Sequence, residues 1–179
     1  MNTNGLLFSK NFAGNRTTSY TYRVVKVQCI GAPYKHTRLN HCKLEIFPNA
    51  TTGVNISITV PMILNYVEIS VQLFYKYNSY RPFMIDWSIE YCQAFRSERN
   101  IPSTALLLKV IAVTLSDFYY QCPHGNRTYY DVWMLDTKLI PPTIPSGDYR
   151  LDISLKDSSN IPLIRAQIFG AVRKHGIFG

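Results

Sequence analysis

The sequence predicts an all-β fold of two packed sheets, and three observations favour it. Apolar and polar residues alternate along several segments, which is typical of strands that bury one face. Aromatic residues make up 13% of the 179-residue chain, including 13 Tyr, and aromatic side chains favour strands. Proline, glycine and short polar clusters separate these segments. A chain of this length can bury the core of one domain.

The first half of the chain predicts three strands. Residues 17–28 are rich in Thr, Tyr and Val, and residues 42–46 and 54–60 alternate between apolar and polar side chains. In the third segment the apolar residues face one way, while Asn55, Ser57 and Thr59 face the other. We therefore expect a glycan on Asn55, which lies in an Asn-x-Ser sequence, to point outward.

The best-defined unit is a hairpin between residues 67 and 91. Residues 67–75 and 83–91 each alternate with period two, and Asn78-Ser79 between them predicts a turn. Phe83, Ile85, Trp87, Ile89 and Tyr91 are expected to share the inward face of the second strand.

The pattern changes between Cys92 and Cys122. Apolar residues recur at spacings of three and four, and Ser103 or Thr104 after Pro102 could begin a helix. We expect one short helix here, although the Val and Ile content also permits a strand. Residues 128–138 predict a further strand.

The C-terminal third predicts a proline-rich lead-in to a second hairpin. Pro141, Pro142 and Pro145 lack the backbone donor that a ladder needs, and Ser146-Gly147-Asp148 supplies a turn in which Gly147 could take a positive φ. Residues 149–156 alternate cleanly, residues 157–160 form a turn, and residues 163–172 return as the last strand. We expect residues 1–17 and 175–179 to be tails of a domain spanning 18–174.

The cysteines and glycosylation sequences favour an oxidising compartment. Cys29, Cys42, Cys92 and Cys122 form no Cys-x-x-Cys pair, which disfavours zinc, and four cysteines allow three pairings. Four Asn-x-Ser/Thr sequences suggest glycosylation in secretion, at Asn15, Asn49, Asn55 and Asn126. Yet residues 1–10 lack the basic and apolar regions of a signal peptide, and no apolar run is long enough for a transmembrane helix.

A net charge of +8 is compatible with a solvated surface, an anionic membrane or an acidic ligand. The cations are scattered and no recognition-helix pattern occurs, so we expect no nucleic-acid partner. The four His lack metal-ligand spacing, and no nucleophile elbow or phosphate-binding glycine loop is present. We therefore expect no enzyme activity, no cofactor and no metal.

Several segments together resemble the ML lipid-recognition domains, including the ganglioside activator protein. They are the Tyr-rich strand 71–83, Tyr91-Cys92, Cys122-Pro123, the proline-rich linker, Gly147-Asp148-Tyr149-Arg150 and the last strand. The chain looks most similar to insect secreted ML-like proteins of largely unknown function, over residues 22–173. The resemblance implies an immunoglobulin-like β-sandwich or cup, and it favours the pairing Cys92–Cys122, which leaves Cys29–Cys42.

The resemblance also implies an apolar cavity between the sheets, whereas inward apolar faces of this pattern usually form a filled core. The expected lining comprises Ile56, Ile58, Val60, Val67, Ile69, Val71, Leu73, Tyr75, Ile85, Trp87, Ile89, Leu151, Ile153, Leu155, Ile164 and Ile168. A rim for membrane contact is expected at the first hairpin turn, at Tyr77, Tyr80, Arg81 and Phe83.

The predicted function is a monomeric, secreted, non-enzymatic binding protein for a lipid or other hydrophobic ligand, which could be a chemical signal. A ligand such as a sixteen-carbon acyl tail would gain up to about 12 kcal/mol from burial before binding costs. The alternative is an extracellular interaction module with a filled core that recognises a receptor.

Overall fold

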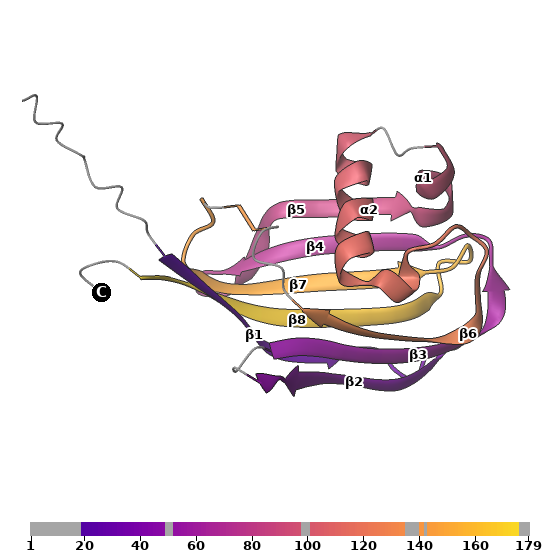
Figure 1. The fold of residues 1–179 in the computed structure, drawn as a ribbon, viewed down its shortest axis with the longest axis horizontal. Helices are drawn as coiled ribbons and strands as arrows, with labels where there is room; N and C mark the ends of the chain where they lie inside the picture. The colour runs from indigo at the N-terminus through magenta and orange to yellow at the C-terminus, as the bar shows by residue number, and fades with distance from the viewer. Residues whose placement is uncertain (1–18, 49–51, 98–100, 135–139, 142, 176–179) are drawn as a thin grey trace, which may run out of the picture.

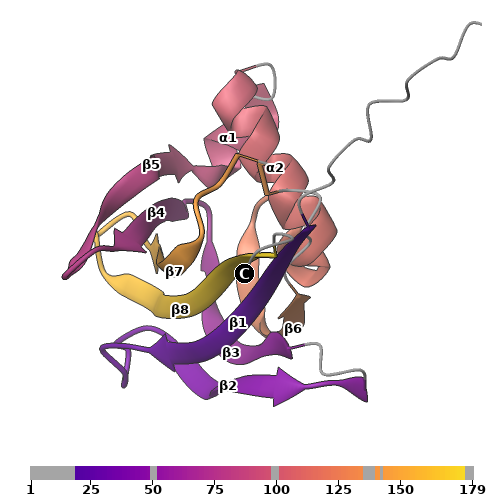
Figure 2. The same cartoon turned by 90° about the vertical axis from the view of Figure 1, so that its left-hand side faces the viewer.

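The computed structural model describes residues 19–48, 52–97, 101–134, 140–141 and 143–175. They form two antiparallel sheets packed face to face, with helices at one side (Figures 1 and 2). The predicted all-β sandwich is confirmed. The predicted tails fall almost wholly outside the described residues, as do Asn15 and Asn49, so those expectations stay predictions.

The larger sheet has the strand order β1-β8-β7-β4-β5. Its strands are β1 (Ser19–Cys29), β4 (Glu68–Lys76), β5 (Tyr80–Glu90), β7 (Gly147–Lys156) and β8 (Pro162–His175). The two predicted hairpins, β4–β5 and β7–β8, lie next to each other because β4 also pairs with β7. The inward faces of both hairpins therefore form one continuous apolar surface.

The smaller sheet has the order β2-β3-β6, with β2 (Arg38–Ile46), β3 (Thr52–Leu64) and β6 (His124–Met134). The central strand β3 is longer than predicted, because it continues through Pro61 with a change of register between Val60 and Ile63. Bulges are positions where proline is tolerated in a sheet. The predicted strand 128–138 begins earlier than expected, and residues 135–139 lie outside the described part.

The region between Cys92 and Cys122 contains more helix than predicted. Instead of one short helix, it forms α1 (Tyr91–Ser97), α2 (Pro102–Thr114) and the 3₁₀ helix η2 (Ser116–Phe118). The Glu90 carboxylate accepts hydrogen bonds from the backbone N–H groups of Cys92 and Gln93 and so caps α1. Glutamate is not a usual N-cap residue, which is why the sequence pattern missed this start.

The N-terminus of α2 also corrects the prediction. Ile101 is the N-cap residue and Pro102 occupies the first turn, whereas Ser103 or Thr104 was expected to cap the helix. Proline suits this position because its missing N–H would have no helical partner. Figure 2 shows α2 running beside β6, with α1 at the end of β5.

Both expected disulfides are present. Cys29–Cys42 joins β1 of the larger sheet to β2 of the smaller one, and Cys92–Cys122 joins α1 to the segment before β6. Each should stabilise the fold by roughly 3 kcal/mol by restricting the unfolded chain. The first bridge holds the sheets together, and the second holds the helices to the sandwich.

Gly147 has a positive φ, as predicted: it begins β7 with a φ of 159°. The structure adds a second reason for glycine at this position. A Cβ atom here would collide with the Tyr75 ring, which passes directly over the backbone.

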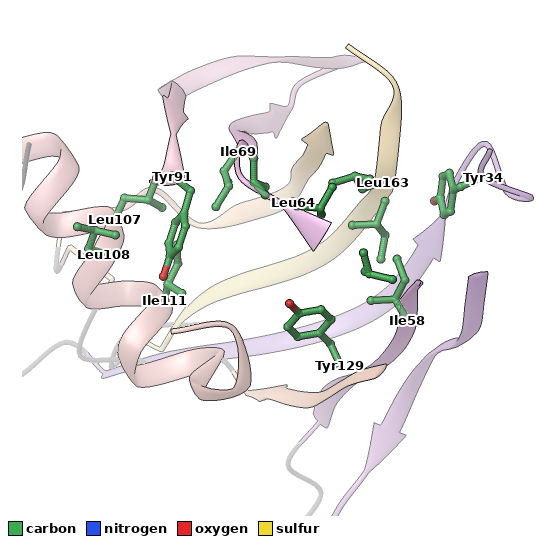
Figure 3. Close-up of a cluster of buried hydrophobic side chains, with 13 residues drawn as sticks. Tyr34, Ile58, Leu64, Ile69, Tyr91, Leu107, Leu108, Ile111, Tyr129 and Leu163 are labelled. Carbon is green, nitrogen blue, oxygen red and sulfur yellow. The ribbon is translucent and has the colours of Figure 1, made fainter. Parts of the chain in front are cut away.

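The buried core has two parts. The larger joins both sheets to α2 through residues such as Ile58, Ile69, Leu107 and Ile111 (Figure 3), and a smaller cluster centres on Val54. Because α2 contributes to the larger part, the helix belongs to the sandwich and is not an appendage.

Candidate functional site

An apolar cavity of about 200 Å³ lies between the two sheets and α2. Most of its lining is contributed by β3 and β6 from the smaller sheet, by β4, β7 and β8 from the larger sheet, and by the helical region. The residues that line it are Val54, Ile56, Ile58, Val60, Leu64, Val67, Ile69, Val71, Tyr91, Leu107, Val110, Ile111, Thr114, Leu115, Phe118, His124, Tyr129, Asp131, Trp133, Leu151, Ile153, Leu155, Leu163, Ile164, Ala166 and Ile168.

The helix forms one wall of the cavity. Figure 3 shows Leu107 and Ile111 of α2 on the side of the helix that faces Tyr129 of β6. Phe118 of η2 stacks on the Tyr129 ring, with ring centroids 4.7 Å apart and an interplanar angle of 11°. Helix, 3₁₀ turn and small sheet are therefore packed as one unit around the space.

The structure brings most of the predicted lining together. The residues that were expected and do line the cavity are Ile56, Ile58, Val60, Val67, Ile69, Val71, Leu151, Ile153, Leu155, Ile164 and Ile168. They come from the middle of the sandwich, where alternation alone identifies the inward face.

The remaining predicted lining residues, Leu73, Tyr75, Ile85, Trp87 and Ile89, lie outside the cavity wall. Trp87 and Ile89 pack at the margin of the larger core cluster, on the edge strand β5. The Tyr75 ring instead contacts Tyr149, with ring centroids 5.1 Å apart. The period of a strand shows which face is inward but not where along the strand the interior stays open.

Sequence reasoning missed the contribution of α2 and of β6. On α2 nearly every position is apolar, so no periodicity separated its two faces. On β6 the alternation of Tyr129, Asp131 and Trp133 was the available signal, since these three side chains all line the cavity. Because the polar Asp131 lies between the two inward aromatic residues, the apolar alternation of β6 was not recognised.

The few polar groups of the lining form hydrogen bonds within the protein. Burial raises the pKa of the Asp131 carboxyl and the nearby Asp117 charge adds to this, although the backbone N–H groups of Asp117 and Val132 act in the opposite direction. Burial also lowers the pKa of His124, whose Nε2 donates to the Tyr120 carbonyl oxygen at 3.2 Å. These groups anchor the chain around the cavity.

The Tyr129 hydroxyl is equally engaged. It accepts a hydrogen bond from the backbone N–H of Gly125 at 2.6 Å and pairs with the Tyr120 hydroxyl. Burial and the Tyr120 contact raise its pKa well above its ordinary range. The described residues that line the cavity include no lysine or arginine, so this wall offers a ligand no lysine or arginine cation.

The expected rim residues do not line this cavity. Phe83 packs against Tyr75 and Tyr149, Tyr80 lies edge-on to Phe169 and below the Arg150 guanidinium, and Tyr77 is 62% exposed. Their hairpin turn follows the end of β4 opposite to the Val67–Val71 stretch that borders the cavity. A role for this turn in membrane contact stays a prediction.

The structure argues against a glycan on Asn55. This residue is only 5% exposed, its Oδ1 accepts from His41 Nε2 at 2.6 Å, and its Nδ2 donates to Glu45 Oε2 at 2.6 Å. The side chain does face away from the cavity, as predicted, but neighbouring strands cover it. Asn126, by contrast, is exposed at the start of β6 and stays a candidate glycosylation site.

The described part of the chain shows neither a metal-binding cluster nor a membrane-spanning helix. No group of His, Cys, Asp and Glu side chains there could hold a metal ion. None of the described helices combines the length and the apolarity that crossing a membrane requires.

A family model matches the middle of the chain. Residues 69–151 match a family described as a protein of unknown function (DUF1091). This span runs from β4 into β7 and is less than half of the 179 residues. The comparison with curated proteins finds no match.

Two solved structures are similar to this chain. A Niemann-Pick type C2 protein from Japanese carpenter ant is 12% identical with a TM-score of 0.40, and the match covers 79% of this chain and 95% of that chain. Chicken MD-1, solved in complex with lipid IVa, is 13% identical with a TM-score of 0.36, over 86% of this chain and 98% of that chain.

Proposed function

We propose that this protein is a secreted, non-enzymatic carrier that holds a small, neutral hydrophobic molecule in the cavity between its two sheets. The observation that carries the proposal is the cavity itself, whose wall is apolar apart from a few engaged polar groups. Such a space can bury an apolar ligand away from water, and this binding needs no catalytic group.

The volume limits the size of the ligand. A cavity of about 200 Å³ exceeds the ~150 Å³ that suffices for benzene, and it is below the ~300 Å³ at which typical small-molecule sites begin. It therefore suits roughly eight to ten carbon atoms by comparison with benzene. A sixteen-carbon acyl tail, the size considered from sequence, exceeds this space.

The wall also selects the ligand's charge. Asp131 is the one acidic residue among the described lining residues, which include no lysine or arginine that could pair with a carboxylate. A fatty-acid anion would lose its hydration without gaining a partner. Neutral chains such as hydrocarbons or alcohols fit better, and each buried methylene would contribute about 0.8 kcal/mol before binding costs.

The sequence resemblance to insect ML-like proteins points to the same class and suggests a hydrophobic chemical signal as the cargo. Two disulfides and an exposed Asn-x-Thr sequence at Asn126 support secretion, because both modifications belong to oxidising compartments. The two disulfides lie around the cavity, which supports a structural role for them.

A series of linear alcohols from hexanol to hexadecanol tests the proposal by titration calorimetry. Affinity should rise several-fold with each added methylene and stop rising at about ten carbons, and decanoate should bind more weakly than decanol. Native mass spectrometry of protein secreted from insect cells would identify the natural cargo. Absence of binding along the whole series would contradict the proposal.

A further inference from the structure

Helix α2 has two apolar faces, of which only one is covered. Thr104, Leu107, Leu108 and Ile111 are buried against the sandwich. On the opposite side Leu106 is 45% exposed and Val113 is 57% exposed, although leucine and valine side chains are usually buried. A surface helix normally turns charged residues outward, so this outer face is unusual.

The two exposed apolar residues of the outer face lie on one side of the helix. Leu106 and Val113 are seven residues apart, which places them two turns from each other on the same side. They therefore form one apolar ridge along α2. Ile101, just before the helix, is also 47% exposed.

A single cation lies in the middle of this ridge. Lys109 is exposed one turn from Leu106 and one turn from Val113, and it forms no ion pair with a described residue. The helix sequence contains no Asp or Glu, and the whole chain carries a net charge of +8. The ridge therefore combines apolar side chains with positive charge.

The same helix forms the wall of the cavity. Leu107, Val110 and Ile111 of α2 line the space, and Val110 lies next to Leu106 and Val113 on the helix surface, so the ridge borders the side of the helix that faces the cavity. Whatever covers the outer face therefore lies within one helix diameter of the proposed ligand, about 10 Å.

We infer that the outer face of α2 docks on an anionic lipid bilayer. A bilayer offers apolar chains for Leu106 and Val113, and its anionic headgroups suit Lys109, whose long side chain can extend to the interface. The docking itself does not depend on the proposed function. Only its purpose rests on that function, because docking would bring the cavity to a source of hydrophobic ligand.

The β4–β5 turn is the natural comparison surface. It also carries exposed apolar residues and a cation, but its rings pack on one another and it lies away from the cavity. If apolar exposure near a cation were sufficient, both surfaces would bind membranes equally. Docking by α2 is the alternative to the membrane contact expected of this turn, and it predicts that changes on the helix, and not on the turn, lower vesicle binding.

Co-sedimentation of the full chain with phosphatidylcholine vesicles, with or without phosphatidylserine, tests the inference. The variant Leu106→Ser/Val113→Ser should lower vesicle binding by about tenfold or more, because it removes most of the inserted apolar surface. Lys109→Gln should lose the part of binding that depends on phosphatidylserine and fades with salt. The matched control Tyr80→Ser/Arg81→Glu at the β4–β5 turn should bind like the wild type.

The inference is overturned if the wild type does not sediment, if the α2 double variant sediments like the wild type, or if the turn variant alone loses binding. A wild-type dimer that Leu106→Ser/Val113→Ser converts to a monomer also overturns it, because a second copy then covers the face. Alcohol titration of the same variants separates the two proposals. Alcohol binding without vesicle binding rejects docking alone, and vesicle binding without alcohol binding rejects the carrier function alone.

Discussion

The two ends of the sandwich interior are both apolar, but one is filled and the other is open. At the end near the β4–β5 turn, the Tyr75 ring lies 4.7 Å from Tyr77, 5.6 Å from Phe83 and 5.1 Å from Tyr149, centroid to centroid. At the end near α2, mostly aliphatic side chains surround a cavity of about 200 Å³.

The difference follows from side-chain shape and from hydrogen bonding. Aromatic rings reach across neighbouring strands and interlock edge to face, and the Tyr75 and Tyr149 hydroxyls donate to the carbonyl oxygens of Ser146 and Pro145. Burial and the two neighbouring tyrosines raise the pKa of Tyr149 to about 12. Branched aliphatic residues are shorter, so they leave space where the sheets and α2 stand apart.

The open end is held together by links between loops instead of by its own side chains. The Cys92–Cys122 bridge fastens the helices, and His36 Nδ1 lies 2.7 Å from Asp157 Oδ2 between the β1–β2 loop and the β7–β8 turn. We therefore expect packing changes to lower stability most at the filled end. At the open end, we expect the loss of these links to lower stability most.

The largest effect is expected from Cys92→Ser. Cys92 is fully buried, and its bridge closes a loop between residues 30 positions apart, so the variant should lose roughly 2–5 kcal/mol of unfolding free energy or fail to be secreted. Urea denaturation and secreted yield would measure this. An unchanged midpoint would show that side-chain packing alone holds the open end.

Gly147→Val should destabilise the filled end by about 1–3 kcal/mol, because its Cβ would collide with the Tyr75 ring. Gly170→Ala is the matched control, since a Cβ there would approach only the Arg23 carbonyl oxygen at 3.4 Å. Thermal unfolding of both variants would test the comparison. Equal melting temperatures would mean that the aromatic cluster can rearrange at little cost.

Ala166→Leu should have a small effect on stability, within about 1.5 kcal/mol, because the added carbon atoms can enter the cavity instead of overpacking a filled core. The same variant should shorten the longest alcohol that gains affinity by a few carbons. Calorimetric titration measures the second effect. A large loss of stability with unchanged alcohol binding would place the open space elsewhere.

The smallest effect concerns acid and the His36–Asp157 contact. Burial alone would raise the pKa of Asp157, but backbone N–H groups of Ile161 and Ser159 together with His36 lower it below the ordinary value of 3.8. A carboxyl with a lowered pKa stabilises the fold above its unfolded pKa, and this contribution disappears as pH falls through the folded value.

Asp157→Asn should therefore be less stable than the wild type at neutral pH, and the difference should shrink below about pH 4. Urea midpoints across this range would check the expectation. A constant difference at all pH values would show that the ionised carboxyl is not what links the two loops.

The sequence by itself determined the strands, the two hairpins and the inward faces of the central strands. Period-two alternation at 67–75 and 149–155 is a local consequence of backbone geometry, so it needs no knowledge of neighbours. The disulfide pairing and the proposed cavity came from the resemblance to a family, because cysteine spacing alone allowed three pairings.

Only the tertiary structure decided which strands and side chains cover each face of a strand. Asn55 points outward, as alternation requires, yet strands β2 and β6 bury it. Tyr75 and Val71 share one face of β4, but only Val71 reaches open space, because Tyr75 meets Tyr149 from the adjacent strand. Periodicity is set within one strand, whereas filling depends on side chains that meet from distant parts of the chain.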